Sequence, residues 1–274
     1  MLQPVLSFFV ISGCLVYLGL MSFAFFAADG MIFPEISPSY ADGPHIFKLK
    51  AKDGESISAT FLEAPGATSL MLYCHGNGED LGHLRPFLER FQQRGISILA
   101  FDYPGYGTSS GSASELGCYA ATEAAYHYAI DSLSFSAQQI TAYGRSLGGG
   151  PACWLAAHYP LRSLILDSTF TSTFRVITRR KLLPWDAFDN LAQLNKISCP
   201  ILFIHGTKDQ TVPFEHAKIN FSRYLGHKAK LWIDGADHSD LYRIAGSTYT
   251  HCVVDFITQP TSTSDHAHST GSTL

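Results

Sequence analysis

Residues 140–150 read ITAYGRSLGGG, and Ser146 stands in this stretch two residues after Gly144 and two residues before Gly148. The apolar residues before the serine predict a strand and the residues after it predict a helix, which is the setting of a nucleophile elbow. Because this turn is very tight, the flanking positions must almost lack side chains, and glycine meets that need. A glycine-rich phosphate loop is the alternative, but no lysine follows the glycines as it does in a P-loop. The stretch therefore predicts an exposed, nucleophilic serine.

An activated serine needs a base, and the base needs an orienting carboxylate. Enzymes with this elbow carry first the acid and then the histidine downstream of the serine. Asp209 follows the apolar run ILFIHG, His238 follows AKLWID, and Asp167 at the end of LILDS is the rival acid. We predict a triad of Ser146, Asp209 and His238. We expect the competing histidines to be structural or solvated, namely His205, His216, His227, His251, His266 and His268.

Acyl transfer also requires hydrogen-bond donors for the developing oxyanion. The run SLMLYC leads into the turn His75-Gly76-Asn77-Gly78, which is able to present the Asn77 amide. The Leu147 amide follows the serine at a helix N-terminus, where the helix dipole favours negative charge. An ordinary turn is the alternative for HGNG. We predict the amides of Asn77 and Leu147 as the oxyanion hole.

Short apolar runs alternate with amphipathic stretches along the rest of the chain. The runs are SLMLYC, ISILAFDY, ITAYG, LRSLILDS, CPILFIHG and AKLWIDG. Strands that are apolar on both faces and alternate with helices indicate a parallel sheet covered on both sides. Before them, HIFKLKA and SISATFLEA flank the turn dipeptide Asp53-Gly54 and predict an antiparallel hairpin. The predicted fold class is α/β, with a mostly parallel central sheet.

An uncharged segment, VLSFFVISGCLVYLGLMSFAFFAA, covers residues 5–28. About 20 such residues cross the hydrocarbon layer as a helix, so a single-pass transmembrane anchor is the first interpretation. Three alternatives stay open: a signal peptide cleaved after Ser22-Phe23-Ala24, a lipoprotein signal around Cys14, and a buried core helix. Because no Lys or Arg precedes Lys48, the side of the membrane is not determined.

The expected organisation is an anchor at 1–28, a proline-containing linker at 29–44, a catalytic domain at 45–260 with a short cap at 171–197, and a disordered polar tail at 261–274. The large apolar residues of the cap either line an acyl pocket or pack the cap onto the sheet: Phe174, Leu182, Leu183, Trp185 and Phe188. Its basic residues either meet lipid headgroups or an acidic substrate, or form a solvated face: Arg175, Arg179, Arg180 and Lys181.

The overall charge and the cysteines argue against several classes of protein. A formal net charge of -4 gives no basic field for a phosphate backbone, so we expect no nucleic-acid partner. The six cysteines form no CxxC pair of the kind that a structural zinc site or a redox motif shows. We therefore expect no metal and no cofactor.

The motifs HGNGEDLGH, FDYPGYGTSSG, YGRSLGGGP, LDSTFTS, HGTKDQTVP and GADHSDL together resemble the α/β-hydrolase family, in its small, short-lid, membrane-anchored branch. That branch includes palmitoyl-protein thioesterases and is described as serine-aminopeptidase-like. The resemblance covers the chain from about Ile32 to Ile257. It implies the α/β-hydrolase fold, with Ser146, Asp209 and His238 as the triad and Asn77 and Leu147 as the oxyanion amides.

The expected function is that of a membrane-bound serine hydrolase of the esterase or thioesterase type. It would cleave carboxylic esters or thioesters through an acyl-enzyme on Ser146, with a small-molecule or lipid-linked acyl compound as its substrate. An aminopeptidase-like amide hydrolase is the alternative among enzymes. A non-catalytic binding protein of the same fold is the alternative from another class.

Overall fold

The computed structural model describes residues 2–34 and 36–260, so the tail expected at 261–274 lies outside the described residues. Within those ranges eight strands form one sheet in the order β1-β2-β4-β3-β5-β6-β7-β8. The strands are β1 (Phe47–Lys50), β2 (Ser56–Leu62), β3 (Leu70–Cys74), β4 (Ser97–Phe101), β5 (Ile140–Arg145), β6 (Ser163–Asp167), β7 (Ile201–Gly206) and β8 (Lys228–Ile233). The helices are α1 (Leu2–Ile32), α2 (Leu81–Gln92), α3 (Glu115–Asp131), α4 (Gly149–His158), α5 (Thr173–Thr178), α6 (Asn190–Gln193), α7 (Glu215–Arg223), α8 (Leu241–Ala245) and α9 (Ser247–Thr258).

The direction of the strands follows the sequence prediction. Strands β1 and β2 pair antiparallel, and β2 also pairs antiparallel with β4. From β4 across to β8 every neighbouring pair is parallel. The predicted hairpin and the mostly parallel sheet are therefore confirmed. Because parallel strands end at the same edge, the loops after β3, β5, β7 and β8 lie along one edge of the sheet.

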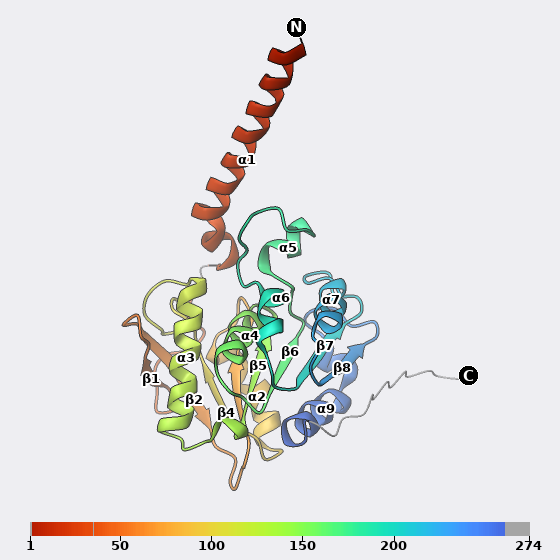
Figure 1. Cartoon of the computed structure of the whole chain (residues 1–274). Helices are drawn as coiled ribbons and strands as arrows, with labels where there is room; N and C mark the ends of the chain where they lie inside the picture. Colours follow the sequence, from red (N-terminus) through yellow and green to blue (C-terminus); the bar gives the residue numbers. More distant parts are fainter. Residues whose placement is uncertain (1, 35, 261–274) are drawn as a thin grey trace, which may run out of the picture.

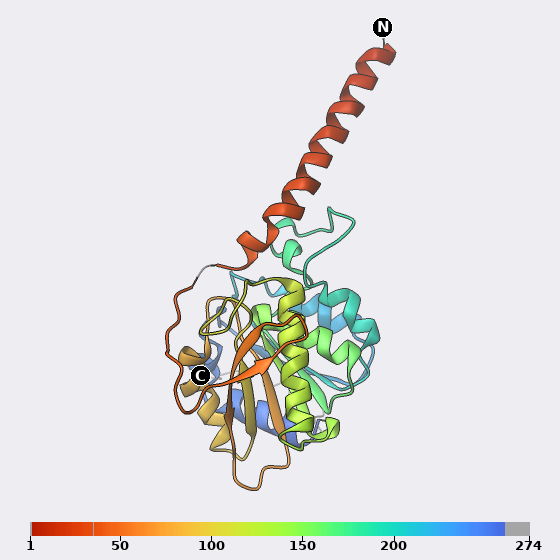
Figure 2. The same ribbon diagram turned by 90° about the vertical axis from the view of Figure 1, so that its left-hand side faces the viewer.

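The central strands are apolar throughout because they are covered on both faces. In β3, Leu70, Leu72 and Cys74 belong to one buried cluster, whereas Met71 and Tyr73 belong to the other. Helices α3, α4, α6 and α7 cover the first cluster, and α2, α8 and α9 cover the second (Figures 1 and 2). Alternate side chains of a strand point to opposite faces, so both sets must be apolar.

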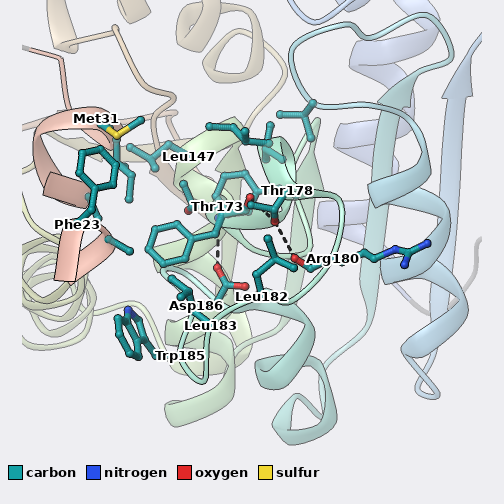
Figure 3. A pocket seen from close by; sticks show the side chains of 18 of the residues that line it. Phe23, Met31, Leu147, Thr173, Thr178, Arg180, Leu182, Leu183, Trp185 and Asp186 are labelled. Atoms are coloured by element: carbon teal, nitrogen blue, oxygen red, sulfur yellow. Dashed lines mark hydrogen bonds between the residues drawn. The ribbon is translucent and has the colours of Figure 1, made fainter. Parts of the chain in front are cut away.

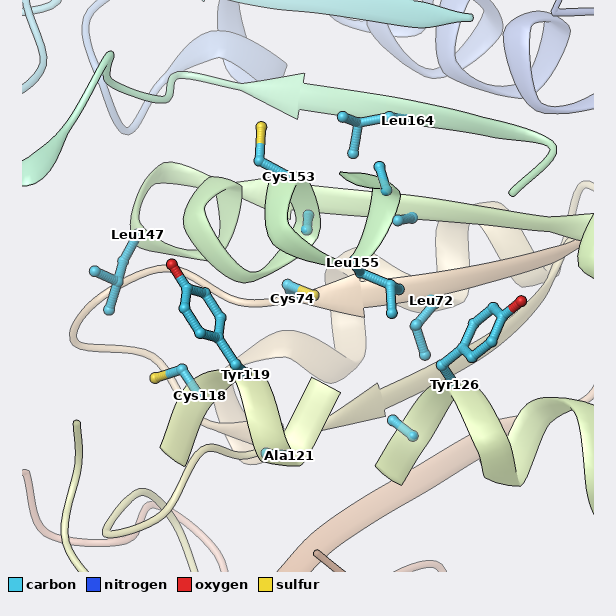
Figure 4. Packing of buried hydrophobic residues seen from close by; sticks show 14 of the residues in the cluster. Leu72, Cys74, Cys118, Tyr119, Ala121, Tyr126, Leu147, Cys153, Leu155 and Leu164 are labelled. Carbon is cyan, nitrogen blue, oxygen red and sulfur yellow. The ribbon is translucent and has the colours of Figure 1, made fainter. Parts of the chain in front are cut away.

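The contact between α3, α4 and the sheet shows how tightly the first cluster is packed. Tyr119 of α3 and Leu155 of α4 belong to the same cluster as Leu72 and Cys74 of β3 (Figure 4). Of the cysteines, all of which are unpaired and fall in the described ranges, four are buried: Cys74, Cys118, Cys153 and Cys199. These cysteines serve as small apolar side chains of the core, as free cysteines commonly do.

Helix α1 projects away from the body of the molecule, and its carboxyl-terminal half approaches the domain (Figure 1). It is long and apolar enough to cross a membrane, and large side chains such as Phe8, Phe9 and Phe26 are exposed along it. The helix continues to Ile32, four residues beyond the expected end at Ala28. It stops there because Pro34 disfavours helical geometry at the residue before it.

Candidate active site

The turn after β5 has the geometry of a nucleophile elbow. Ser146 has a φ of +51°, in the left-handed region that side chains other than glycine rarely adopt. A Cβ atom on Gly148 would overlap the backbone of Cys74 in the neighbouring strand, and a Cβ atom on Gly144 would overlap the backbone of Gly148. Glycine is therefore required at both positions, which explains why the G-x-S-x-G motif has glycine there.

The three residues predicted as a triad lie together, although 92 residues separate the serine from the histidine. The Nε2 atom of His238 lies 3.0 Å from the Oγ atom of Ser146. On the other side of the ring, Nδ1 lies 2.7 Å from Oδ2 of Asp209. Asp209 follows β7 and His238 follows β8, so the parallel strands carry both side chains to the edge where the elbow stands. This chain of contacts is the arrangement that lets histidine accept the proton of a serine hydroxyl.

The carboxylate of Asp209 is buried and held by four hydrogen-bond donors. Its Oδ1 atom accepts from the amides of Thr211 and Val212, at 2.9 and 2.7 Å. Its Oδ2 atom accepts from His238 and lies 3.2 Å from Nε2 of His205, which also donates to the carbonyl of Val212. Burial alone would raise the pKa of Asp209, but the hydrogen bonds from His205 and His238 outweigh it and hold that pKa well below its usual range. The acid therefore stays ionised opposite the histidine.

The position of His205 is a feature that the sequence interpretation missed. We expected a structural or solvated side chain, and the structure places it against the triad carboxylate. Its spacing of four residues from Asp209, across the end of β7, is the available signal in the sequence.

Two of the other histidines follow the expectation, since His227 and His251 are exposed. Burial lowers the pKa of His216 to about 4, and its neutral ring accepts the Thr171 amide proton. His266 and His268 lie outside the described residues.

The rival acid, Asp167, has different partners. Its Oδ2 atom accepts from the hydroxyls of Tyr143 and Tyr249, at 2.7 and 2.6 Å, and its Oδ1 atom accepts from Ser168. All three donors are buried. These contacts give Asp167 a structural role, since they connect β5, β6 and α9. Asp209 is the carboxylate that contacts His238.

The loop after β3, where the sequence predicts an oxyanion donor, is fixed by side chains around it. Asn77 donates from its side chain to the carbonyl of Ile32 at 2.6 Å and accepts from the hydroxyl of Tyr106 at 2.5 Å. Tyr103 donates to the carbonyl of His75 at 2.9 Å. The two tyrosines come from FDYPGYG, a motif to which the sequence interpretation gave no role. Since the Asn77 side chain is engaged in these contacts, its backbone amide is the group that would serve an oxyanion.

An ion pair joins this loop to the elbow. The guanidinium of Arg145, the residue before the serine, pairs with the carboxylate of Glu79. The same carboxylate accepts from the amide of Gly76 at 3.0 Å. Glu79 therefore connects the loop after β3 to the elbow. The pattern G-x-S-x-G leaves the position of Arg145 free, so the motif does not reveal this contact.

A cavity of about 620 Å³ opens above the serine, and its walls are largely apolar. Ser146, Leu147 and Asn77 are among the residues that line it. Figure 3 shows Leu182, Leu183 and Trp185 of the cap around it, facing Phe23 and Met31 of α1. The cavity therefore joins the polar groups of the elbow and of the loop after β3 to largely apolar walls.

The cap residues divide between the two roles considered for them. Phe174, Leu182, Leu183 and Trp185 line the cavity, whereas Phe188 is fully buried and packs against the rings of Phe33 and Tyr119. The basic residues divide as well. Arg175 pairs with Asp186 and Asp189, while the run Arg179, Arg180 and Lys181 is exposed. Among residues 2–34 and 36–260, no group of three His, Cys, Asp or Glu side chains is arranged to hold a metal ion.

Comparisons with known proteins agree with this architecture. A family pattern described as the alpha/beta hydrolase fold matches residues 69–185. The chain is 35% identical over 204 residues to human alpha/beta hydrolase domain-containing protein 17B, covering 73% of this chain and 71% of that one. It is 34% identical to the 17C protein of Xenopus tropicalis over 73% of this chain. That alignment spans 66% of the 17C protein, just under two thirds of its length.

Solved structures of similar shape include several esterases. An esterase from Pyrococcus furiosus superposes with a TM-score of 0.70 at 18% identity, over 84% of this chain and 99% of the other. A puromycin-hydrolysing peptidase from Mycobacterium tuberculosis superposes with a TM-score of 0.65 at 15% identity, over 81% of this chain and 40% of the other. At such low identity these likenesses establish the fold alone.

Proposed function

Because the chain belongs to the α/β-hydrolase family, we propose that it is a serine hydrolase that cleaves carboxylic esters or thioesters through an acyl-enzyme on Ser146. The observation that carries the proposal is the continuous contact from Asp209 through His238 to Ser146, with distances of 2.7 and 3.0 Å. The esterase and thioesterase reactions share this machinery, since they differ only in the leaving group.

In the first half of the reaction, the Ser146 oxygen attacks the substrate carbonyl while Nε2 of His238 accepts the hydroxyl proton. Asp209, kept ionised by its donors, stabilises the imidazolium that forms. The negative charge on the carbonyl oxygen is received by the amides of Asn77 and Leu147. The C–O or C–S bond then breaks, and the departing alcohol or thiol takes the proton from His238. The acyl group remains bound to Ser146 as an ester.

In the second half, water replaces the leaving group. His238 accepts a proton from the water as its oxygen attacks the acyl carbonyl, and the same two amides receive the negative charge. The bond between the carbonyl and the Ser146 oxygen breaks, and His238 returns the proton to the serine. A carboxylic acid leaves, and the enzyme is restored without a cofactor.

The walls of the cavity support an acyl compound as the substrate, and α1 supports a membrane location. Ser146 is one of the residues around a cavity of about 620 Å³ that is lined mainly by apolar side chains. We propose that α1 is a single-pass anchor, because it has the length and composition of a spanning helix and its large apolar side chains are exposed. An anchored enzyme keeps this cavity next to compounds that carry hydrocarbon chains.

The residues that line the cavity give less support to a peptidase function. An aminopeptidase requires a carboxylate that receives the ammonium group of the substrate. Asp186 is the carboxylate among the residues that line the cavity, and it is occupied by Arg175, by the Ser172 hydroxyl and by the Phe174 amide. A non-catalytic binding role would require none of the triad contacts, all of which are present.

We expect the rate of hydrolysis to rise with the length of the acyl chain. Each methylene that enters the apolar cavity contributes up to about 0.8 kcal/mol of transfer free energy, available to transition-state binding. A series of p-nitrophenyl esters from acetate to palmitate, assayed with the full-length protein in detergent, measures this as kcat/KM. A steady fall in kcat/KM from the acetyl ester upward would contradict an acyl-binding cavity and favour a small polar substrate.

A further inference from the structure

The cavity above Ser146 has two walls from distant parts of the chain. One wall is the cap between β6 and β7, and the other is the carboxyl-terminal half of α1. Besides Ile32 at the end of the helix, six α1 residues line it and share one face of the helix: Tyr17, Leu20, Phe23, Ala24, Ala28 and Met31. In Figure 3, Phe23 and Met31 of α1 lie beside Leu147, the residue next to the nucleophile. A helix that merely tethered the domain would contribute no wall to the site.

Specific contacts hold α1 against both the cap and the loop after β3 that contains Asn77. The hydroxyl of Tyr17 donates to the carbonyl of Leu182 at 3.0 Å. The rings of Phe25 and Trp185 meet edge to face, with centroids 6.4 Å apart. At the end of the helix, the carbonyl of Ile32 accepts from the Asn77 side chain at 2.6 Å. The helix is therefore fixed at both ends of the cavity.

The length of α1 places the cavity at the membrane surface. The helix has 31 residues, which at 1.5 Å each span about 46 Å, whereas the hydrocarbon layer is about 30 Å thick. About ten residues at the carboxyl-terminal end therefore exceed the layer when the amino-terminal residues cross it, and Tyr17 and Leu20 then lie just inside its boundary, so the cavity extends across the membrane surface. At the tip of the cap, Ile177 and Leu182 are 77% and 58% exposed beside the basic run 179–181. Apolar side chains next to basic ones suit the boundary between acyl chains and headgroups.

We infer that α1 is a wall of the acyl-binding site that determines its chain-length specificity, and that a membrane-dissolved acyl chain enters sideways between α1 and the cap. This inference rests on the proposed ester or thioester hydrolysis for its substrate class. The anchor then has two roles, since the segment that holds the enzyme in the bilayer also shapes the site that receives the chain. Its residues, and not only those of the cap, set the depth available to the substrate.

The small residues on the inner face of α1 offer a direct test. Ala24 is half-buried and lines the cavity, so a phenyl ring at this position would occupy space meant for the chain. Ser22 is exposed and lies about 200° around the same helix. The variant Ser22→Phe is thus a matched control, with the same added ring on the outer face. Phenylalanine is already frequent in α1, so both variants keep its apolar character.

The first measurement compares p-nitrophenyl butyrate and palmitate as substrates of the full chain in detergent. Each methylene excluded from an apolar site lowers kcat/KM by roughly fourfold, so Ala24→Phe is expected to lower the palmitate-to-butyrate ratio of kcat/KM by about tenfold or more. An unchanged Tm would show that the variant is folded. Ser22→Phe should keep the wild-type ratio. Equal ratios in all three proteins would overturn the inference.

The second measurement reports binding without turnover, and so separates this inference from the proposed hydrolysis. In the Ser146→Ala background, cis-parinaric acid, a fluorescent long-chain fatty acid, is titrated while energy transfer from tryptophan is recorded. Trp185 lines the cavity and is the expected donor. Ala24→Phe should raise the Kd by about tenfold, as the same methylene contacts are lost, and Ser22→Phe should not.

Equal binding by both variants would overturn the inference, whatever the hydrolysis assays give. A selective loss in Ala24→Phe would support the α1 wall even if the wild type cleaved no ester, in which case the proposed hydrolysis would fail alone.

Discussion

Replacing Ser146 by alanine is expected to lower kcat for p-nitrophenyl esters by roughly 10⁴- to 10⁶-fold, the range found when a triad nucleophile is removed. The reason is that the hydroxyl forms the covalent bond to the acyl group, and no neighbouring atom can replace it. The variant should remain folded, because the change removes one oxygen atom whose described side-chain contact is Nε2 of His238. Alanine also adds no atom at position 146, where the backbone has a positive φ.

Steady-state kinetics together with thermal unfolding would check this expectation. An unchanged Tm with kcat lowered by roughly 10⁴- to 10⁶-fold is the predicted pair of results. Turnover within about tenfold of the wild type would be far above the activity that remains after loss of a nucleophile. It would show that another group attacks the substrate.

Replacing Asp209 by asparagine is expected to lower kcat by about 10⁴-fold, because an amide favours the wrong tautomer of the histidine and cannot stabilise the imidazolium. The four donors around the carboxylate would also lose their charged acceptor. Asp167→Asn is the matched control, since it is the same substitution at another buried carboxylate on the same edge of the sheet.

The control should separate catalysis from stability. Asp167 accepts from Tyr143, Tyr249 and Ser168, so its replacement disturbs a buried hydrogen-bond network and is expected to cost about 1 to 3 kcal/mol of unfolding free energy. Its effect on kcat should stay within about tenfold, because it does not contact the histidine that acts in the reaction. If Asp167→Asn lowered kcat more than Asp209→Asn, the carboxylate would be wrongly assigned.

The elbow and the positions of the strands along the chain could be predicted because each depends on local sequence. Gly144 and Gly148 are imposed by close backbone contacts within a few residues of the serine or in the adjoining strand. The strands of the sheet are recognisable because both faces are buried, which makes their residues apolar in unbroken runs. Asp209 and His238 follow two such strands directly, so placing the strands also placed these side chains.

The walls of the cavity could not be predicted, because they depend on contacts between distant segments. Tyr17 and Leu182 are 165 residues apart, and nothing in either segment specifies the other. For the same reason the sequence could not separate Trp185, which lines the cavity, from Phe188, which packs into the core. The pair of Arg145 and Glu79 was hidden because a motif fixes the residues that must be small or reactive and leaves the others free.

Covalent labelling of the full chain by a fluorophosphonate tests the central claim, an activated nucleophile at Ser146, most directly. The reagent phosphonylates a serine only where a base activates it and an oxyanion site receives the phosphoryl oxygen. Intact mass followed by peptide mapping should find one adduct, on Ser146, and His238→Ala should abolish it while the fold is retained. An adduct on another residue, or a folded wild-type protein that takes up no label, would contradict the account.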